Sequence, residues 1–179
     1  NDPLLTSGGF ALTKRDRLSY AILHQVSGEY RGTFFDEALA VSLGVRAPFF
    51  TRKLNQYCYT TTANASSGFI DCIGNQDPTA FEAANPYVVN YTTGTVTGYA
   101  PPQSRTYKYD KVLPNLGLTY KFGDAGSVFL NYAKGLSVPG TDPLYASLYY
   151  PADFTGVQPA PETTDSFDAG VRFKSGKLQ

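Results

Sequence analysis

The sequence contains no methionine and no tryptophan, and it has only one histidine and two cysteines. Because a native reading frame begins with methionine, we expect the chain to be processed or to be part of something longer. The single histidine, His24, falls within an alternating apolar pattern, and no catalytic serine or aspartate is matched to it. A structural role is therefore expected for His24. Two cysteines without a second pair or a histidine cluster argue against a zinc site.

Catalytic motifs are also missing. The carboxylates are scattered, and no phosphate-binding loop, G-x-S-x-G or H-E-x-x-H spacing occurs in the sequence. The sequence therefore gives no support to an enzyme, and no cofactor or metal is expected.

Charge is scarce and balanced, because charged residues make up 17% of the chain and 15 basic residues face 15 acidic ones. No basic excess exists to neutralise phosphates, which removes the whole-chain electrostatic argument for nucleic-acid binding. No run approaches the roughly 18 apolar residues of a transmembrane helix. A membrane β-barrel stays possible, since its strands alternate between two faces and show no such run.

Aromatic residues are abundant instead, with 14 tyrosines and 12 phenylalanines in 179 residues, a length that allows one ordinary domain. Few charges together with many Tyr, Phe, Thr and Val favour strands over helices. Residues 115–122 and 127–133 alternate apolar and polar side chains around the short segment 123–126, which predicts a tight hairpin. The five expected strands are about 17–35, 39–54, 107–122, 127–138 and 164–174.

The strands and their connections follow the plan of an outer-membrane barrel. Soluble strands usually have about 5 to 6 residues, whereas a tilted bilayer crossing takes about 9 to 11 and strands can continue beyond it. The connections alternate between short turns (36–38 and 123–126) and long loops (about 55–106 and 139–163). Short turns on one side and long loops on the other are typical of barrels in the outer membrane.

One face of each expected strand is apolar and the other is polar. The polar face carries glycine, serine and charged residues, which suit a wet barrel lumen and do not fill a dry core. The same alternation also fits a soluble antiparallel sheet with one solvated face. The expected lumen-facing residues are Arg31, Arg46, Lys121, Asn131 and Arg172.

Three stretches resemble the TonB-dependent outer-membrane receptors of Gram-negative bacteria. They are 112–122 (VLPNLGLTYKF), 128–139 (VFLNYAKGLSVP) and 161–177 (PETTDSFDAGVRFKSGK), in the order and spacing of the family's barrel. The P-E-T-x-D-x-F-x-x-G-x-R pattern marks the entry from a variable loop into a strand. Residues 18–54 also fit the family's middle strands, so the resemblance covers most of the chain outside the loops.

The resemblance implies an all-β, antiparallel transmembrane barrel segment, supplying about five strands of a 22-strand barrel with a plugged lumen. Residues 1–179 show no plug-like segment and no TonB-contacting box, so we expect them to be a partial barrel domain. Implied partners are the TonB–ExbB–ExbD energy-transducing complex, acting through the missing plug, together with outer-membrane lipid, lipopolysaccharide and a small-molecule solute. The implied function is TonB-dependent uptake of a scarce solute, such as a siderophore or carbohydrate, across the outer membrane.

The two long loops differ from the rest of the chain in charge, because they hold six acidic residues and a single basic one, Arg105. This shortage of cations argues against an anionic ferric chelate and for a neutral or cationic solute. Cys58 and Cys72 lie in the first loop, where an oxidising cell surface permits a disulfide.

Loop tyrosines are the candidates for ligand binding. An exposed tyrosine offers a flat apolar ring with a hydroxyl, which suits sugars or aromatic chelates. The alternative is a structural role, in which each tyrosine packs one loop against another. Residues 87–100 are also expected to form a small hairpin about Thr93-Gly94. The candidate tyrosines are Tyr57, Tyr59, Tyr87, Tyr91, Tyr99, Tyr145, Tyr149 and Tyr150.

The principal alternative is a soluble or surface-attached β-sandwich, an adhesin whose loops bind glycans. Dependence on detergent separates the two hypotheses. A protein that is monomeric without detergent, with the face of Leu116, Leu118 and Tyr120 in a closed core, would contradict the barrel.

Overall fold

The computed structural model describes residues 4–5, 11–13, 15–61, 71–73 and 78–173, and it divides the chain into two compact units. The fold is all-β and antiparallel, with few helices, and the main sheet is not closed on itself within the part of the chain described. The sheet unit comprises Leu23–Phe50, Tyr109–Val138 and Pro161–Gln179. The loop unit comprises Asn1–Ile22, Thr51–Lys108 and Pro139–Ala160.

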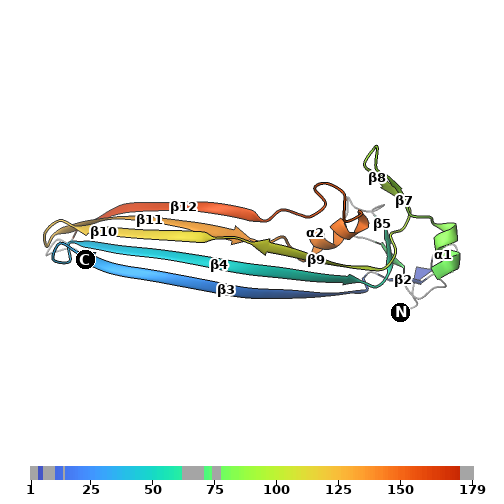
Figure 1. The fold of residues 1–179 in the computed structure, drawn as a ribbon, viewed down its shortest axis with the longest axis horizontal. Helices are drawn as coiled ribbons and strands as arrows, with labels where there is room; N and C mark the ends of the chain where they lie inside the picture. The colour runs from blue at the N-terminus through green and yellow to red at the C-terminus, as the bar shows by residue number, and fades with distance from the viewer. Residues whose placement is uncertain (1–3, 6–10, 14, 62–70, 74–77, 174–179) are drawn as a thin grey trace. The chain divides into compact units, whose positions relative to one another are not determined.

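The sheet unit is built from long antiparallel strands that lie side by side (Figure 1). Their order is β12-β11-β10-β4-β3, and β9 also pairs with β4. Residues 17–22 of β3 and 51–56 of β4 are grouped with the loop unit. The strands are β3 (Arg17–Phe34), β4 (Leu39–Gln56), β9 (Gln103–Asp110), β10 (Leu113–Lys121), β11 (Gly126–Ser137) and β12 (Glu162–Phe173).

Two short turns join neighbouring strands. The β3–β4 turn places Phe35, Asp36 and Glu37 in the left-handed region, with φ of 56°, 50° and 65°, and the Ala38 amide donates to the Phe35 carbonyl at 3.0 Å. The β10–β11 turn uses Gly123, whose φ of 70° costs a glycine little. Both turns reverse the chain within a few residues, as the alternation of short and long connections predicts.

The expected strand at 107–122 is two strands, β9 and β10, separated by Lys111 and Val112. Leu113 pairs with Arg46, so Lys111 reaches the level of Pro48 on β4. Proline has no backbone N–H and cannot complete the ladder at this point. The Lys111 amide still donates to the Pro48 carbonyl at 3.4 Å, which keeps β9 and β10 on the same neighbour despite the interruption.

Register gives the main sheet two distinct faces. Leu116 pairs with both Leu43 and Tyr132, and Leu130 pairs with Leu118 and Ala169, so apolar side chains share one face. On this apolar face many side chains are exposed. They include Leu43, Val45, Tyr120, Val128, Leu130, Phe167, Val171 and Phe173.

The loop unit has secondary structure of its own where the sequence predicted long loops. Its small sheet has the order β1-β2-β6-β5, and β7 pairs with β8. Most of the side chains that are buried among the described residues belong to this unit. Its elements are β1 (Leu4–Leu5), β2 (Ala11–Thr13), β5 (Tyr59–Thr61), β6 (Asp71–Ile73), α1 (Pro78–Ala84), β7 (Val88–Asn90), β8 (Thr95–Thr97), α2 (Thr141–Ala146) and the 3₁₀ helix η2 (Ser147–Tyr149).

The expected hairpin within residues 87–100 is confirmed as β7–β8, in which Val89 pairs with Val96. Asn90 stabilises the turn, because its side-chain oxygen accepts hydrogen bonds from the amides of Thr92 (3.0 Å) and Thr93 (3.1 Å). Gly94 completes the reversal with a φ of 69°.

Candidate functional site

The polar face of the main sheet brings together the residues expected to face a barrel lumen. Asn131 pairs with Gly117 on β10 and with Asp168 on β12, while Arg172 pairs with Ser127. Arg46 pairs with Leu113, and Lys121 pairs with Ser127. These positions all lie on the face opposite the Leu116 and Leu130 side chains, because neighbouring residues of a strand point to opposite faces.

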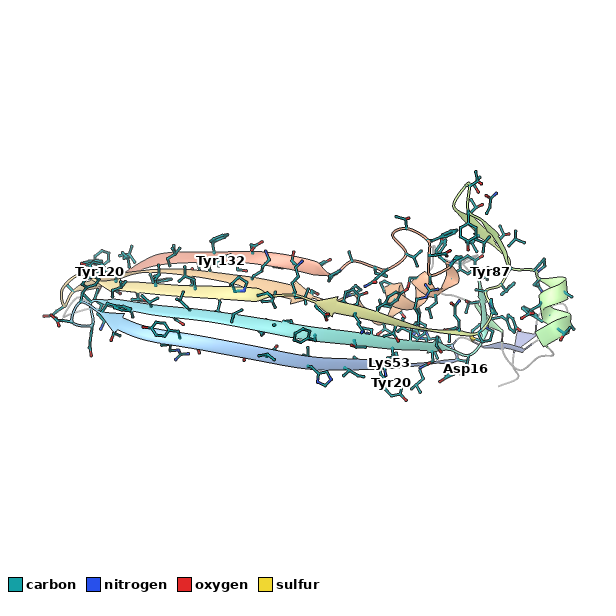
Figure 2. The ribbon with its side chains drawn as sticks, in the orientation of Figure 1. Asp16, Tyr20, Lys53, Tyr87, Tyr120 and Tyr132 are labelled. Carbon is teal, nitrogen blue, oxygen red and sulfur yellow. A yellow bond between two sulfur atoms is a disulfide. The ribbon has the colours of Figure 1, made fainter. Side chains whose placement is uncertain are left out.

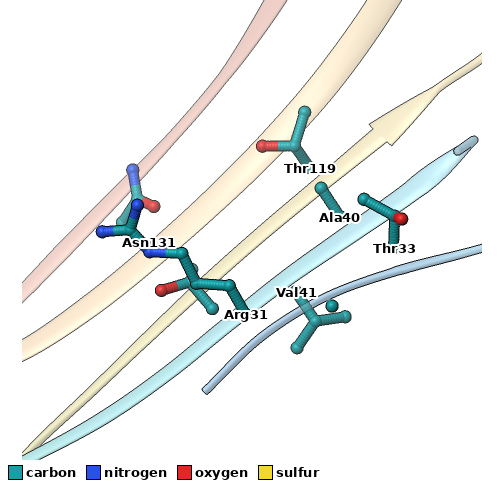
Figure 3. A pocket seen from close by; sticks show the side chains of 9 residues that line it. Arg31, Thr33, Ala40, Val41, Thr119 and Asn131 are labelled. Atoms are coloured by element: carbon teal, nitrogen blue, oxygen red, sulfur yellow. The ribbon is translucent and has the colours of Figure 1, made fainter. Parts of the chain in front are cut away.

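A hollow of about 450 Å³ lies on this face around Arg31, Ser42 and Asn131. Figure 3 shows Arg31 and Asn131 on the same side of the sheet as Thr119, with Val41 on the other side. Gly117 contributes no side chain, which leaves the surface of β10 open at this point.

Charged side chains on β3 are held by hydrogen bonds along this face. Arg31 Nε donates to Glu29 Oε1 at 2.7 Å, and Ser42 Oγ on β4 donates to the same oxygen at 3.1 Å. A second hollow, of about 700 Å³, includes Glu29, Arg46 and Asn115 in its lining. The polar face therefore offers fixed charges of both signs and hydrogen-bonding groups along β3 and β4.

An aromatic ring also lies on the polar face. Phe129 pairs with Gly170, and its ring covers that glycine so closely that a Cβ there would lie 2.6 Å from a ring atom. The Arg172 guanidinium lies over the Phe129 ring at 4.8 Å from its centroid. Glycine, phenylalanine and arginine thus form one stacked group, in which the cation–π contact orients the Arg172 side chain.

The candidate tyrosines fall into different environments in the loop unit. Tyr59, Tyr145 and Tyr149 are buried, with 7%, 3% and 2% of their surface exposed. Tyr59 donates to Glu82 Oε1 at 2.9 Å, and Tyr149 donates to the Gly98 carbonyl at 3.0 Å. These three rings pack loop against loop in the structure, so their faces are not available to a solute.

Tyr57 and Tyr91 are exposed, and Tyr87, Tyr99 and Tyr150 are half-buried. Figure 2 labels Tyr87, whose hydroxyl donates to the Tyr149 carbonyl. Burial raises the pKa of Tyr87 to about 12, with nearby Tyr149 adding to the effect. Burial also raises the pKa of the Tyr145 hydroxyl above its usual value.

A hollow of about 400 Å³ lies between the β7–β8 turn and the segment that follows α2. The Phe154 ring meets Tyr91 edge-on at 5.1 Å between centroids and lies 6.3 Å from Tyr150. Tyr150 and Phe154 line the hollow, and no charged side chain does. The lining residues are Gly94, Pro143, Ala146, Ser147, Tyr150, Phe154, Thr155, Gly156, Val157 and Pro159.

Arg105, the single basic residue of the expected loops, has a structural role that the sequence did not predict. Its guanidinium donates to the carbonyls of Ser147 (3.0 Å) and Tyr150 (2.8 Å), to the Tyr107 hydroxyl (3.1 Å) and to Gln103 Oε1 (3.2 Å). Arg105 therefore joins β9 to the end of η2. Because these bonds use its donors, the cation is not directed at a solute.

The start of α2 is held in a similar way. Arg17 donates to Asp142 Oδ1 at 2.5 Å and lies over the Tyr145 ring at 4.4 Å from its centroid. The hydrogen bond from Arg17 lowers the pKa of the Asp142 carboxyl. Asp142 in the first turn also interacts favourably with the helix dipole.

Cys58 and Cys72 are joined by a disulfide in the structure. Both residues are buried, and the bond ties the segment between β4 and β5 to β6 of the small sheet. The disulfide is thus part of the packed core of the loop unit.

The described ranges contain no group of three or more His, Cys, Asp or Glu side chains arranged to hold a metal ion. Within the same ranges, no helix has the length and apolar character needed to cross a membrane.

Comparison with known families identifies a matching family. A family model described as "TonB dependent receptor-like, beta-barrel" matches residues 3–179. Searches among curated proteins and among solved structures found no significant match to this chain.

Proposed function

The chain belongs to the TonB-dependent receptor β-barrel family, and from this premise we propose that it is part of a receptor that captures a scarce solute and moves it across the outer membrane. The family is one of outer-membrane transport receptors in Gram-negative bacteria. The proposed solute is a siderophore, a carbohydrate or a similar small molecule.

The match over residues 3–179 is the observation that carries the proposal. The two faces of the main sheet support it. Apolar side chains such as Phe167 (74% exposed), Val171 (54%) and Phe173 (75%) have a large exposed area, as expected for a surface that meets lipid. The opposite face carries charges, amides and glycines, as expected for a wet lumen.

In the proposed mechanism, the polar face is the wall past which the solute moves. The residues proposed to face the lumen are Arg31, Arg46, Lys121, Asn131 and Arg172. Their main proposed role is to pair with carboxylates of a plug domain or to hold water. Movement of the plug, driven by the TonB–ExbB–ExbD complex, would then free the path for the solute.

Initial capture is assigned to the loop unit. The hollow bounded by Tyr150 and Phe154 falls in the size range of small-molecule sites, roughly 300 to 1,000 Å³, at about 400 Å³. Its uncharged lining and the acidic character of the loops support a neutral or cationic solute. Tyr91 extends the aromatic surface beside it through its contact with Phe154.

Uptake by cells that carry the full-length receptor tests the proposal. A deletion strain should lose growth on limiting concentrations of one solute class, and the full-length gene should restore it. Dissipating the proton-motive force should stop accumulation while surface binding persists. Accumulation that persists without the proton-motive force would contradict TonB-dependent uptake, and a protein that stays monomeric in water without detergent would favour the glycan-binding adhesin instead.

Single substitutions then test the loop hollow. Phe154→Ala should weaken surface binding by about 2- to 13-fold, because an aromatic stacking contact is worth roughly 0.5–1.5 kcal/mol beyond its buried area. Val88→Ala is the matched control, since Val88 is exposed in the same unit and does not line the hollow. An equal loss of binding in both variants would show that the hollow is not part of the binding site.

A further inference from the structure

A polar cluster interrupts the apolar face of the main sheet. Lys134 pairs with Asp165 across β11 and β12, and its ammonium group lies 3.1 and 3.2 Å from the two carboxylate oxygens. The Tyr132 hydroxyl donates to Asp165 Oδ1 at 2.7 Å. Tyr132 also packs against Phe167, with 5.0 Å between ring centroids.

These side chains share the face of Leu130 and Val171, because Tyr132 and Lys134 follow Leu130 at intervals of two residues. Figure 2 shows Tyr132 farther along the sheet from the short turns than Tyr120. The ion pair thus interrupts the apolar face on β11 and β12, at a level farther from the short turns than Leu130 and Val171.

The position of the cluster matches one boundary of a hydrocarbon layer. On β12, Phe173 and Asp165 are eight positions apart, which corresponds to roughly 26 Å along the strand and about 19–22 Å along the membrane normal at a tilt of 35–45°. On β3, Phe34 and His24 are ten positions apart, or about 23–27 Å at the same tilt. The outward apolar band of such barrels is about 25 Å tall, which lies within the β3 range and a few ångström above the β12 range.

Energetics favour the same depth. A lipid-facing charge is costly at the midplane and costs little near the interface, so an exposed ion pair on this face fits the interface. Tyrosine is also enriched at that level, where its ring meets hydrocarbon and its hydroxyl meets water. The side chains of Lys134 and Asp165 are 27% and 46% exposed.

We propose that Tyr132, Lys134 and Asp165 lie in the headgroup layer of the outer leaflet and that Lys134 binds a lipid phosphate there. An ammonium group has three N–H donors, and Asp165 does not saturate them. Asp165 and Tyr132 orient the lysine, and the phosphate provides the complementary charge. The inference rests on family membership and concerns a different surface from the solute path.

Depth measurements on the full-length protein test the placement. Single cysteines at outward positions of β12 carry spin labels in vesicles of phosphatidylcholine with 30% phosphatidylglycerol, and accessibility to oxygen and to a water-soluble nickel complex gives the depth. We expect labels at Val171 and Ala169 in hydrocarbon and a label at Thr163 in water. Asp168, on the polar face, is the control. Nickel access at Ala169, or a label at Thr163 as deep as that at Ala169, overturns the placement.

Lipid dependence tests the phosphate contact. Adding 30% phosphatidylglycerol to phosphatidylcholine vesicles should raise the melting temperature of the unmodified protein more than that of Lys134→Gln, and Lys134→Arg should recover the difference. Lys121→Gln, on the polar face, should respond like the unmodified protein. An equal response of Lys134→Gln and the unmodified protein overturns the phosphate contact. Solute uptake is measured separately, so its failure would count against the proposed function and not against this site.

Discussion

Removal of the Arg105 side chain should loosen the loop unit without opening the main sheet. Two of its hydrogen bonds end on backbone carbonyls, those of Ser147 at 3.0 Å and Tyr150 at 2.8 Å. In Arg105→Ala both carbonyls lose a charged donor, and Tyr107 and Gln103 lose a partner as well. The contact between β9 and η2 then depends on packing and on two remaining hydrogen bonds, one from Gln103 Nε2 to the Leu148 carbonyl (2.5 Å) and one between the Tyr107 and Ser147 hydroxyls (2.7 Å).

The size of the effect follows from the two carbonyl bonds. A hydrogen bond to a charged group contributes about 1.5–3 kcal/mol, and the lower value applies to this partly buried group because water can replace the donor. Two such bonds give about 3 kcal/mol, which corresponds to a roughly 150-fold increase in local opening.

Hydrogen exchange of the full-length protein measures this opening directly. Amides of residues 141–150 should exchange about 150-fold faster in Arg105→Ala, whereas amides of β11 should be unchanged. Arg105→Lys keeps the charge but lacks the planar fork that reaches several acceptors, so an intermediate rate is expected. An increase below about 3-fold in Arg105→Ala would refute the assigned role.

Three further perturbations have defined outcomes. Cys72→Ser removes a constraint on a ring of about 15 residues worth roughly 3 kcal/mol, so limited proteolysis should cleave the loop unit faster, and unchanged cleavage would contradict this. The pKa of Tyr87 is near 10.0 in the unfolded chain and about 12 in the folded protein. The contribution of its neutral hydroxyl to stability is therefore present below pH 10 and is lost as pH rises to about 12. Tyr87→Phe should reduce the fall in melting temperature between about pH 10 and pH 12, and an identical fall in both proteins would refute this. Gly170→Ala should destabilise the sheet by about 1 kcal/mol, because a Cβ would displace the Phe129 ring. Gly28→Ala is the control and should be neutral, since no atom lies within 4 Å of the added Cβ. Equal melting temperatures of the two variants would count against this packing.

Local patterns were sufficient for the broad architecture. Alternation at residues 115–122 and 127–133 identified both faces of a hairpin, because a strand places every second side chain on the same side. Two of the three stretches that resemble the family, 112–122 and 128–139, cover this hairpin, and the family match spans all three. The break between β9 and β10 needed the register, since it depends on Pro48 lying at the level of Lys111 on another strand.

The loop unit was beyond local patterns for a different reason. Tyr59 and Tyr57 are neighbours in sequence and similar in chemistry, yet one is 7% exposed and the other 51%. Burial depends on which distant segments pack together, such as α1, which supplies Phe81 against Tyr59 at 4.9 Å between ring centroids. No periodicity within residues 55–106 encodes that contact.

The sequence by itself determined strand character, the two faces and the family, because these follow from side-chain alternation and short motifs within single segments. Tertiary structure decided which tyrosines are buried, that Arg105 holds η2, and that Lys134 meets Asp165. Each of these depends on residues more than 20 positions apart, such as Tyr59 and Glu82 (23 apart), Lys134 and Asp165 (31 apart) or Arg105 and Ser147 (42 apart). Such contacts are fixed by strand register and long-range packing, which minimise free energy over the whole chain and leave no local signature.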